Sequence, residues 1–329
     1  MHNATPSMQA IAVMTSGGDA PGMNSAIRSV VRTALGKGLD VYGIQRGYTG
    51  LLEGDIFSMD ASSVGNIIQK GGTILGTSRC PEFHEPEIRK EAANILKRKK
   101  IDGLVVIGGN GSFNGAQQLS SEHSLPVAAI PGTIDNDIEN TCYTIGFDTA
   151  VETAVNAVDK IRDTANAHER IFIVEVMGRS SHAIAVHTGV CTGAEQVITN
   201  VDDHDFEALA QKVRAGRKRG KRSFIFIIAE RDQPGHAYAI KEKLQQEYAL
   251  SSHVSILGHL QRGGSPTAHD RYLASVMGYR AVEALVEGHQ ASVTALRNGQ
   301  VVIAPLADSL AKRNHVEGFP LKLTHRLSI

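Results

Sequence analysis

Four glycine-containing segments hold the residues of this sequence that could do chemistry. They read TSGGDAPGMN at residues 15–24, GGNGS at 108–112, PGTIDND at 131–137 and LGHLQRGGSP at 257–266. Paired glycines let backbone N–H groups converge on an anion because no Cβ obstructs them, and the N-terminus of a following helix adds a favourable dipole. The first two segments therefore predict phosphate-binding loops.

The third and fourth segments carry charged groups that could act on a phosphorylated substrate. Asp135 and Asp137 can divide two tasks, in which one carboxylate accepts a proton from a hydroxyl group and the other helps to hold Mg²⁺. His259 and Arg262 can bind phosphate oxygens, since a guanidinium group binds them as a fork. A phosphorylated substrate, a nucleotide and a divalent cation together indicate phosphoryl transfer.

Each loop also has a plainer explanation when it is taken alone. A tight turn needs the same glycines, and TIDND could be a solvated turn in which an Asp side chain binds its own backbone. Gly109, Gly111 and Gly115 give the spacing GxGxxxG rather than the GxGxxG of a dinucleotide site, and the sequence has no GxxxxGK[ST] motif. The occurrence of all four loops in one chain favours the chemical explanation.

The segments between these loops predict a doubly wound α/β fold. Continuous apolar runs, typical of strands covered on both faces, occur at residues 11–15, 103–107, 127–130, 170–175 and 224–229. Amphipathic helical patterns occur at residues 25–32, 87–100, 151–161, 205–214 and 272–286. Strands that alternate with helices form mainly parallel sheets, and such folds bind ligands at the carboxyl ends of their strands. Three of the four loops follow a predicted strand.

Length and composition exclude several classes of protein. A chain of 329 residues is longer than one core usually serves, so two domains are expected. The 34 Lys and Arg residues balance 34 Asp and Glu residues, which argues against nucleic-acid and membrane partners, and 42% hydrophobic residues exclude a disordered chain. Cys80, Cys142 and Cys191 form no CxxC pair, and neither a signal peptide nor a membrane-spanning run occurs, so a cytoplasmic protein is expected.

One segment is strongly basic. Residues 214–222 (RAGRKRGKR) hold six basic residues at the predicted end of a helix. They could be a solvated helix terminus, where cations offset the negative end of the dipole, or an anion-binding patch.

From about residue 11 to at least residue 290 the chain resembles the bacterial-type ATP-dependent 6-phosphofructokinases. The resemblance rests on long segments in the order that the family has them: TSGGDAPGMN (15–24), GGTILGTSRCPEF (71–83), PGTIDND (131–137), IGFDTA (145–150), KIRDTA (160–165), EVMGR (175–179) and GHLQRGGSP (258–266). It implies phosphorylation of D-fructose 6-phosphate at its 1-hydroxyl with Mg-ATP, the committed step of glycolysis. Gly111 and Gly132 are small, as in the ATP-using branch, whereas pyrophosphate-using relatives have Asp and Lys there.

The resemblance also implies roles for individual residues. Asp135 would be the general base, assisted by Thr133, while Arg79, Gly18 and Arg179 would face the transferring phosphoryl group. The implied ATP-binding residues are Gly18, Arg79, Cys80, Gly109, Asn110, Gly111 and Ser112, and the implied Mg²⁺ ligands are Asn110 and Asp137. The implied substrate-binding residues are Thr133, Ile134, Asp135, Arg170, Met177, Gly178, Arg179, Glu230, His253, His259 and Arg262.

The family's architecture implies further expectations. Two similar three-layer α/β lobes with mainly parallel sheets would hold the active site in the cleft between them. Residues 1–145, with part of 260–310, would form the ATP lobe, 146–259 the fructose 6-phosphate lobe and 310–329 a C-terminal tail. The chain would form a homotetramer with a site for an effector, ADP or phosphoenolpyruvate, made by Arg28, Arg32, Arg162, Gly193, Glu195, Arg219 and Lys221.

The sequence departs from the family pattern at several positions. Asn110 stands where the family has an Asp that serves the metal, and His253 stands where it usually has an Arg that binds the sugar phosphate. Residues 180–183 (SSHA) replace a stretch with Gly and Asp, and Asp55 and Ser223 fall where effector-site Arg and His are common. Three hypotheses follow: a working 6-phosphofructokinase, a weakly active or inactive paralogue with a regulatory or binding role, and a kinase for another sugar phosphate.

Overall fold

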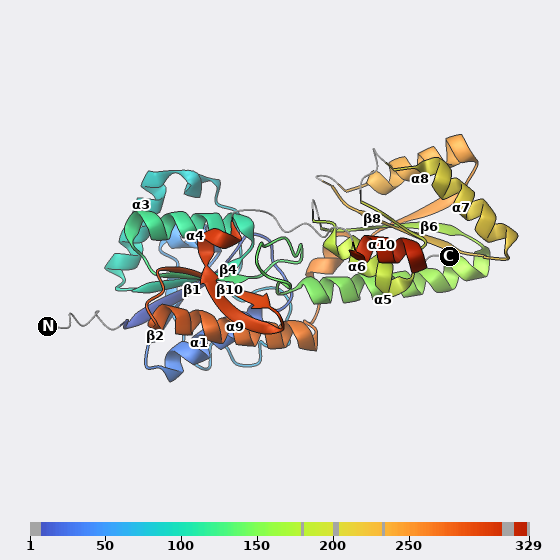
Figure 1. Ribbon diagram of the computed structural model, residues 1–329. Helices are drawn as coiled ribbons and strands as arrows, with labels where there is room; N and C mark the ends of the chain where they lie inside the picture. The colour runs from blue at the N-terminus through green and yellow to red at the C-terminus, as the bar shows by residue number, and fades with distance from the viewer. Residues whose placement is uncertain (1–7, 179–180, 200–203, 232–233, 311–318, 328–329) are drawn as a thin grey trace. The chain divides into compact units, whose positions relative to one another are not determined.

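The computed structural model describes residues 8–178, 181–199, 204–231, 234–310 and 319–327 (Figure 1). The chain divides into two compact units. Unit 1 comprises Met1–Asp148 and Arg262–Asn314, and unit 2 comprises Thr149–Gln261 and His315–Ile329. Each unit is therefore built from segments that are distant in the sequence.

Unit 1 is built on a seven-stranded sheet with the strand order β11-β10-β5-β4-β1-β2-β3. The central pairs are parallel, and only the pairs β2/β3 and β10/β11 at the two edges are antiparallel. Its elements are β1 (Ala10–Ser16), α1 (Met23–Gly36), β2 (Asp40–Ile44), α2 (Gly47–Glu53), β3 (Ile56–Ser58), η1 (Pro81–His84), α3 (Pro86–Arg98), β4 (Gly103–Gly108), α4 (Asn110–His123), β5 (Val127–Pro131), α9 (Ala268–Val286), β10 (Ala291–Arg297), β11 (Gln300–Pro305) and η3 (Leu306–Ser309).

Helices cover both faces of this sheet. In Figure 1, α1 and α9 lie along one face and α3 and α4 along the other. Strands β1, β4 and β5 are buried along their whole length, as their apolar sequences predict for strands covered on two sides. Unit 1 therefore has three layers, with the sheet between two layers of helices.

Unit 2 is a smaller sheet of four parallel strands in the order β7-β8-β6-β9. Helices α7 and α8 lie on one face of it, and α5, α6 and α10 lie on the other (Figure 1). Its elements are α5 (Phe147–His168), β6 (Ile171–Val176), α6 (Ala183–Thr192), β7 (Gln196–Ile198), α7 (Phe206–Lys218), β8 (Phe224–Ala229), α8 (His236–Tyr248), β9 (Ser252–Ile256), η2 (Gly258–Arg262) and α10 (Phe319–Leu327).

The predicted α/β class with mainly parallel sheets is confirmed. Each of the five predicted strands and five predicted helical patterns coincides with an element of the structure. Most of the helices extend further than their patterns, whereas α3 ends at Arg98, two residues before the end of the pattern at 87–100. Strands β2, β3, β7, β9, β10 and β11 were not predicted, because they are short or partly exposed and lack a continuous apolar run. Helix α10, expected within a separate tail, packs against α6 and β7 in unit 2.

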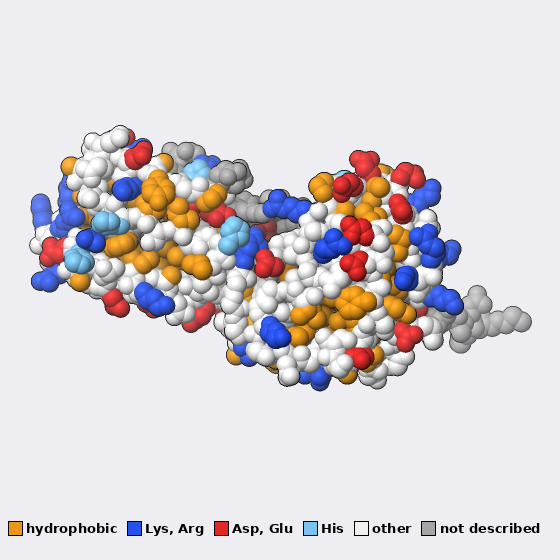
Figure 2. Space-filling view, turned by 180° about the vertical axis from the view of Figure 1, so that it is seen from behind, with side chains coloured by type: hydrophobic (Ala, Val, Ile, Leu, Met, Phe, Trp, Pro, Cys, Tyr) orange, Lys and Arg blue, Asp and Glu red, His pale blue; other side chains and the backbone are white. Residues whose placement is uncertain are grey.

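The surface is consistent with the balanced charge of the sequence. On the face drawn in Figure 2, basic and acidic side chains are interspersed, and hydrophobic side chains lie between them on both units. Among the residues that the structure describes, no helix is both long enough and apolar enough to cross a membrane.

Candidate active site

Three of the four predicted loops begin side by side at one edge of the sheet in unit 1. Strands β5, β4 and β1 are neighbours, and their last residues are in register, with Ser16 opposite Gly108 and Gly108 opposite Pro131. The chain adds β2 on one side of β1 and β4 on the other, so the order of strands reverses at this point. Open α/β sheets bind ligands at such a reversal.

The glycine loop after β4 is shaped by close contacts with its neighbours. A Cβ on Gly108 would lie 2.6 Å from the carbonyl oxygen of Ser16, so no other residue fits there without movement. Gly17, in the loop after β1, has a φ of 87°, which favours glycine. A Cβ on Gly111, in contrast, would meet no atom within 4 Å. This open side of the loop leads directly into the N-terminus of α4, where backbone N–H groups favour an anion.

The loop after β5 is held by its own backbone and hydroxyl groups. The N–H of Thr133 donates to the carbonyl of Ile145 over 3.1 Å, and the hydroxyl of Thr144 donates to the carbonyl of Thr133 over 2.6 Å. The N–H of Asp135 donates to the hydroxyl of Thr133 over 3.3 Å. Only 8% of Asp135 is exposed, and Ile134 is fully buried. With its backbone held in this way, Asp135 presents a carboxylate that can accept a proton from a hydroxyl group placed against it.

The glycine loop and the acidic loop meet at Asn110. Its side-chain Nδ2 donates to the carbonyl of Asp137 over 3.2 Å. The two carboxylates, Asp135 and Asp137, and the amide oxygen of Asn110 are the hard oxygen donors that Mg²⁺ prefers. The described residues include no cluster of three or more His, Cys, Asp or Glu side chains that would hold a metal by themselves. These oxygens fit a Mg²⁺ ion that takes its remaining ligands from a bound molecule.

Arg79 and Cys80 follow a segment that is anchored to the first loop. Asn24 donates from its amide to the carbonyls of Lys70 and Gly71, both over 3.1 Å, and accepts a hydrogen bond from the N–H of Ile74 over 2.8 Å. The hydroxyl of Thr77 donates to the carbonyl of Gly17 over 2.7 Å. The segment that ends in Arg79, whose side chain is exposed, is thus tied to the glycine loop after β1.

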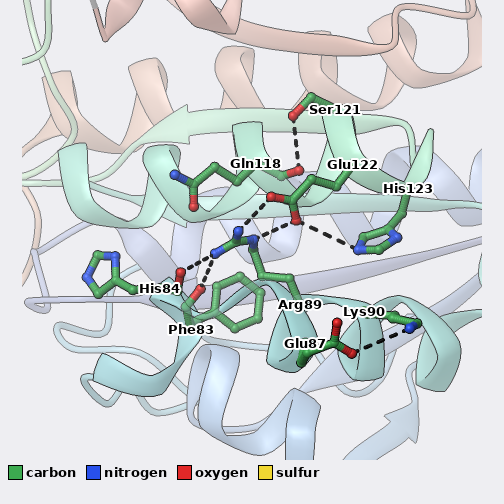
Figure 3. A network of polar contacts seen from close by, with 9 residues as sticks. All are labelled: Phe83, His84, Glu87, Arg89, Lys90, Gln118, Ser121, Glu122 and His123. Atoms are coloured by element: carbon green, nitrogen blue, oxygen red, sulfur yellow. Dashed lines mark hydrogen bonds and ion pairs between the residues drawn. The ribbon is translucent and has the colours of Figure 1, made fainter.

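A buried arginine, Arg89, holds the turn η1, which follows Cys80 (Figure 3). Arg89 on α3 is 4% exposed and forms a two-pronged ion pair with Glu122 on α4, with N–O distances of 2.7 and 2.6 Å. Its Nη1 donates to the carbonyls of Phe83, over 2.9 Å, and His84, over 2.7 Å. The hydrogen bonds from Arg89 to the Glu122 carboxylate lower the pKa of Glu122 below its ordinary value. Helices α3 and α4 and the turn η1 are therefore joined at one guanidinium group.

An aromatic pair connects the same turn to the glycine loop. Phe83 stacks on Tyr48, with ring centroids 3.9 Å apart, and the Tyr48 hydroxyl donates to the carbonyl of Ser112 over 2.6 Å. Full burial raises the pKa of Tyr48, so the phenol stays protonated and remains a donor. The expected nucleotide residue Ser112 is therefore linked through Tyr48 to Phe83, whose N–H donates to the carbonyl of the other, Cys80, over 3.2 Å.

Arg262 lies in unit 1, beside the first glycine loop. Its Nη1 donates to the carbonyl of Asp19 over 3.1 Å, and its guanidinium group occupies the space where a Cβ of Gly18 would be. The structure thus brings together Gly18 and Arg262, for which the sequence predicted contacts with different ligands. His259, three residues earlier, belongs to unit 2.

The other expected sugar-phosphate residues also belong to unit 2. Arg170 immediately precedes β6, while Met177 and Gly178 follow it, and Glu230 follows β8 with its N–H donating to the carbonyl of Val176 over 2.8 Å. His253 lies on β9 with its ring centroid 5.2 Å from that of Phe172. Desolvation, and then the charges of Arg170 and Lys241, lower the pKa of His253. Arg179 lies outside the described residues.

Part of the expected effector set gathers at a buried carboxylate. Glu195 is 2% exposed, and its Oε1 lies 2.7 Å from Nζ of Lys221 and 3.9 Å from Nη1 of Arg162. Arg162 also donates to the carbonyl of Thr192 over 2.6 Å, next to Gly193. Arg219, with an exposed side chain, caps the C-terminus of α7 in the same unit. Arg28 and Arg32, the other two members of the expected set, lie on α1 in unit 1.

Comparison with known proteins identifies the family of this chain. Residues 10–285 match the model of the family described as phosphofructokinase. The chain belongs to the phosphofructokinase family. It is 51% identical over 304 residues to the ATP-dependent 6-phosphofructokinase of Clostridium acetobutylicum, covering 92% of this chain and 94% of the relative. An ATP-dependent 6-phosphofructokinase of Clostridium botulinum (strain Loch Maree) is 50% identical over the same coverage.

Solved phosphofructokinases share the fold. The phosphofructokinase from Saccharomyces cerevisiae superimposes with a TM-score of 0.86 at 34% identity, over 92% of this chain and 44% of that one. This chain therefore spans less than half the length of the yeast subunit. A pyrophosphate-dependent phosphofructokinase from Marinobacter aquaeolei has a TM-score of 0.83 at 19% identity, which shows a common fold alone.

Several supporting residues were not predicted from the sequence. Tyr48 and Arg89 have partners 64 and 33 residues away, so no local spacing points to them. A signal for Arg89 does exist, because Arg is rarely placed among the apolar positions of an amphipathic helix unless it is paired. Arg89 stands one turn before Ala92, on the buried face of α3.

Proposed function

We propose that this chain transfers the γ-phosphoryl group of ATP to the 1-hydroxyl of D-fructose 6-phosphate and forms fructose 1,6-bisphosphate. The observation that carries the proposal is the position of Asp135, a buried carboxylate on a fixed loop next to the glycine loop that begins α4. Curated relatives of nearly the same length, half of whose residues are identical, carry the name of this activity. They do not favour the inactive paralogue.

Proximity and charge would supply most of the catalysis. Asp135 accepts the proton of the attacking hydroxyl, and Thr133, which holds the Asp135 N–H, contacts the substrate. Arg79 and the backbone of Gly18 face the phosphoryl group that is transferred, where fixed positive charge and backbone dipoles stabilise the developing negative charge. Arg179 is assigned the same role by family resemblance alone.

Nucleotide and metal would bind at the N-terminus of α4. Gly109, Gly111 and Ser112 bind the phosphates through the backbone, and Cys80 approaches the nucleotide. Asn110 and Asp137 would hold Mg²⁺, which when bound neutralises phosphate charge. The lack of space at Gly132, where a Cβ would lie 2.9 Å from Ile107, favours ATP over pyrophosphate as donor, since pyrophosphate-using relatives need a lysine there.

The sugar phosphate would bind through Arg170, His253, His259 and Arg262, with Met177, Gly178 and Glu230 at the sugar. We place the enzyme in the cytoplasm, in agreement with its three free cysteines. A homotetramer and an anionic effector at the Glu195 cluster are part of the same proposal.

Steady-state turnover of fructose 6-phosphate with Mg-ATP tests this function. Wild-type turnover should fall by a factor of about 10² to 10⁴ in Asp135→Ser, because the proton acceptor is lost. Asn110→Asp tells a slow enzyme from an inactive paralogue. Wild-type protein that is inactive at saturating substrates but gains strong activity in Asn110→Asp would refute the proposal in favour of the paralogue.

A further inference from the structure

A fully buried glutamine lies in the turn that carries His259. Gln261 belongs to η2 and is 0% exposed, whereas the side chain of His259 is exposed. A 3₁₀ helix has three residues per turn, so the side chains at positions i and i+3 lie on the same side. His259 and Arg262 therefore share one side of η2, and Gln261 points to another. The two expected phosphate ligands therefore leave Gln261 free for a different task.

The carboxamide of Gln261 is bonded to the segment that follows β6. Its Oε1 accepts a hydrogen bond of 2.8 Å from the N–H of Met177, and its Nε2 donates to the carbonyl of Ala150 on α5 over 3.5 Å. Both ends of the amide are thus satisfied inside unit 2. Met177 is the first residue after β6, and Gly178 follows it with a φ of 136°, so the chain turns immediately after the bond.

Backbone pairing between β9 and β6 ends before it reaches η2 and the residues that follow β6. The N–H of Leu257 donates to the carbonyl of Glu175 over 3.0 Å, which continues the pairing of β9 with β6. Gly258 then adopts a φ of 49°, and the chain leaves the sheet. Beyond Leu257, the side chain of Gln261 replaces the backbone in linking η2 to the end of β6.

We propose that Gln261 is a positioning residue for the sugar phosphate. It sets the place of Met177 and Gly178 relative to His259 without contacting the substrate. The inference rests on the proposed function, which puts these three residues at the sugar and its phosphate. It assigns Gln261 to sugar affinity and leaves the nucleotide loops of unit 1 unaffected.

Gln261→Met tests the inference because methionine has nearly the same size and removes both hydrogen bonds. The buried N–H of Met177 then has no acceptor, and the segment after β6 moves to find one. Affinity for fructose 6-phosphate, measured by titration calorimetry without nucleotide, should fall about tenfold, which corresponds to the loss of one such hydrogen bond. KM for fructose 6-phosphate should rise by a similar factor, and KM for ATP should stay within about twofold.

Two further variants separate positioning from general stability. Gln261→Glu keeps an oxygen that can accept the Met177 N–H, so its sugar affinity should stay within about threefold of wild type even though a buried charge lowers its melting temperature. Leu244→Ala removes a fully buried side chain from the hydrophobic core of the same unit. It should lower the melting temperature with no change in sugar affinity.

The outcomes distinguish this inference from the proposed function. Weaker sugar binding in Gln261→Met, with Gln261→Glu and Leu244→Ala close to wild type, supports it. Equal sugar binding in Gln261→Met and wild type overturns it while the kinase function stands, and so does an equal loss in Leu244→Ala. Wild-type protein that binds no fructose 6-phosphate overturns the proposed function and this inference with it.

Discussion

The glycine loop of unit 1 and the Glu195 cluster of unit 2 are both expected to bind anions, but they handle charge in opposite ways. Around Gly108–Ser112 the groups near the open side of the loop are backbone N–H groups, a hydroxyl and the uncharged amide of Asn110. At Glu195, a buried carboxylate already neutralises the cations of Lys221 and Arg162. One region is preorganised by backbone geometry and the other by ion pairs.

This difference has consequences for ligand binding. A phosphate entering the glycine loop displaces water from N–H groups that already point outward, so little of the protein must rearrange. An anion entering the Glu195 cluster meets cations whose charge is shared with a carboxylate. Its affinity therefore depends on how far those ion pairs loosen.

The largest expected effect comes from Arg89, the charged support behind the uncharged loop. Arg89→Met leaves Glu122 and the carbonyls of Phe83 and His84 without their donor. Because the Glu122 carboxylate reaches solvent, most of the cost comes from the two carbonyls that lose a charged donor, and we expect a loss of about 2–4 kcal/mol in unfolding free energy, measured by urea denaturation. KM for ATP should rise by more than KM for fructose 6-phosphate, because η1 directly follows Arg79 and Cys80.

Glu122→Gln is the matched control for this prediction. It retains an oxygen that accepts from Arg89 and leaves the bonds to Phe83 and His84 intact. A loss in Glu122→Gln as large as that in Arg89→Met would mean that the charge pair, and not the anchoring of η1, is what the nucleotide side needs. The contrast between the two regions would then be wrong.

The second prediction places a charge in the loop itself. Asn110→Asp should raise turnover with Mg-ATP by up to roughly a hundredfold, or about 3 kcal/mol, if a carboxylate at this position holds the metal better than an amide. The same change removes the donor to the Asp137 carbonyl and should cost about 1 kcal/mol of stability.

Asn110→Ala separates the two contributions of that variant. It loses the same hydrogen bond without adding charge, so it should be destabilised to the same extent and turn over no faster than wild type. Unchanged turnover in Asn110→Asp would show that the loop works through its backbone alone, which sharpens the contrast with Glu195.

The sequence predicted those features of the fold and the candidate site that depend on local patterns. The apolar runs of β1, β4 and β5 predicted parallel strands, and the glycines marked the loops at their ends because both signals lie within a few neighbouring residues. The hairpin of β10 and β11 was missed, although Asn298 and Gly299 form a typical hairpin turn. Arg89 and Tyr48 were missed for a different reason, since their partners come from distant helices and loops that only the folded chain brings near.

The third prediction concerns the charged region. Glu195→Gln removes the countercharge of Lys221 and Arg162 and weakens the bond that the carboxylate accepts from the Ile225 N–H. We expect a loss of about 1–3 kcal/mol in unfolding free energy, because hydrogen bonds to a charged group are worth more than neutral ones. Lys212, which donates to the carbonyl of Glu195 and whose pKa is already lowered by burial, should titrate at still lower pH in this variant.

Phosphate binding by the Glu195→Gln variant tests whether Glu195 competes with an anion for the cations of the cluster. Binding of inorganic phosphate, followed by titration calorimetry, should strengthen in Glu195→Gln because the cations no longer share their charge with a carboxylate. Weaker phosphate binding would mean that Glu195 orients the cations productively, and the two regions would then differ less than their charges indicate.

The smallest effect is expected at His253, which lies beside cations instead of a carboxylate. Partial desolvation, and then the charges of Arg170 and Lys241, lower the pKa of His253 below the ordinary 6.5. In the pH range between the lowered pKa and 6.5, the unfolded chain therefore binds more protons than the folded one. His253 therefore reduces stability as the pH falls from 7.5 through this range, and His253→Asn should show a smaller loss between pH 7.5 and 5.5 in parallel urea titrations. The effect is small because the ring is exposed and solvent screens the two cations.

NMR titration of the His253 ring gives the direct check, since a midpoint at or above 6.5 contradicts the prediction. Added fructose 6-phosphate should raise that midpoint, because a phosphate dianion beside Arg170 offsets the charge that disfavours the protonated ring.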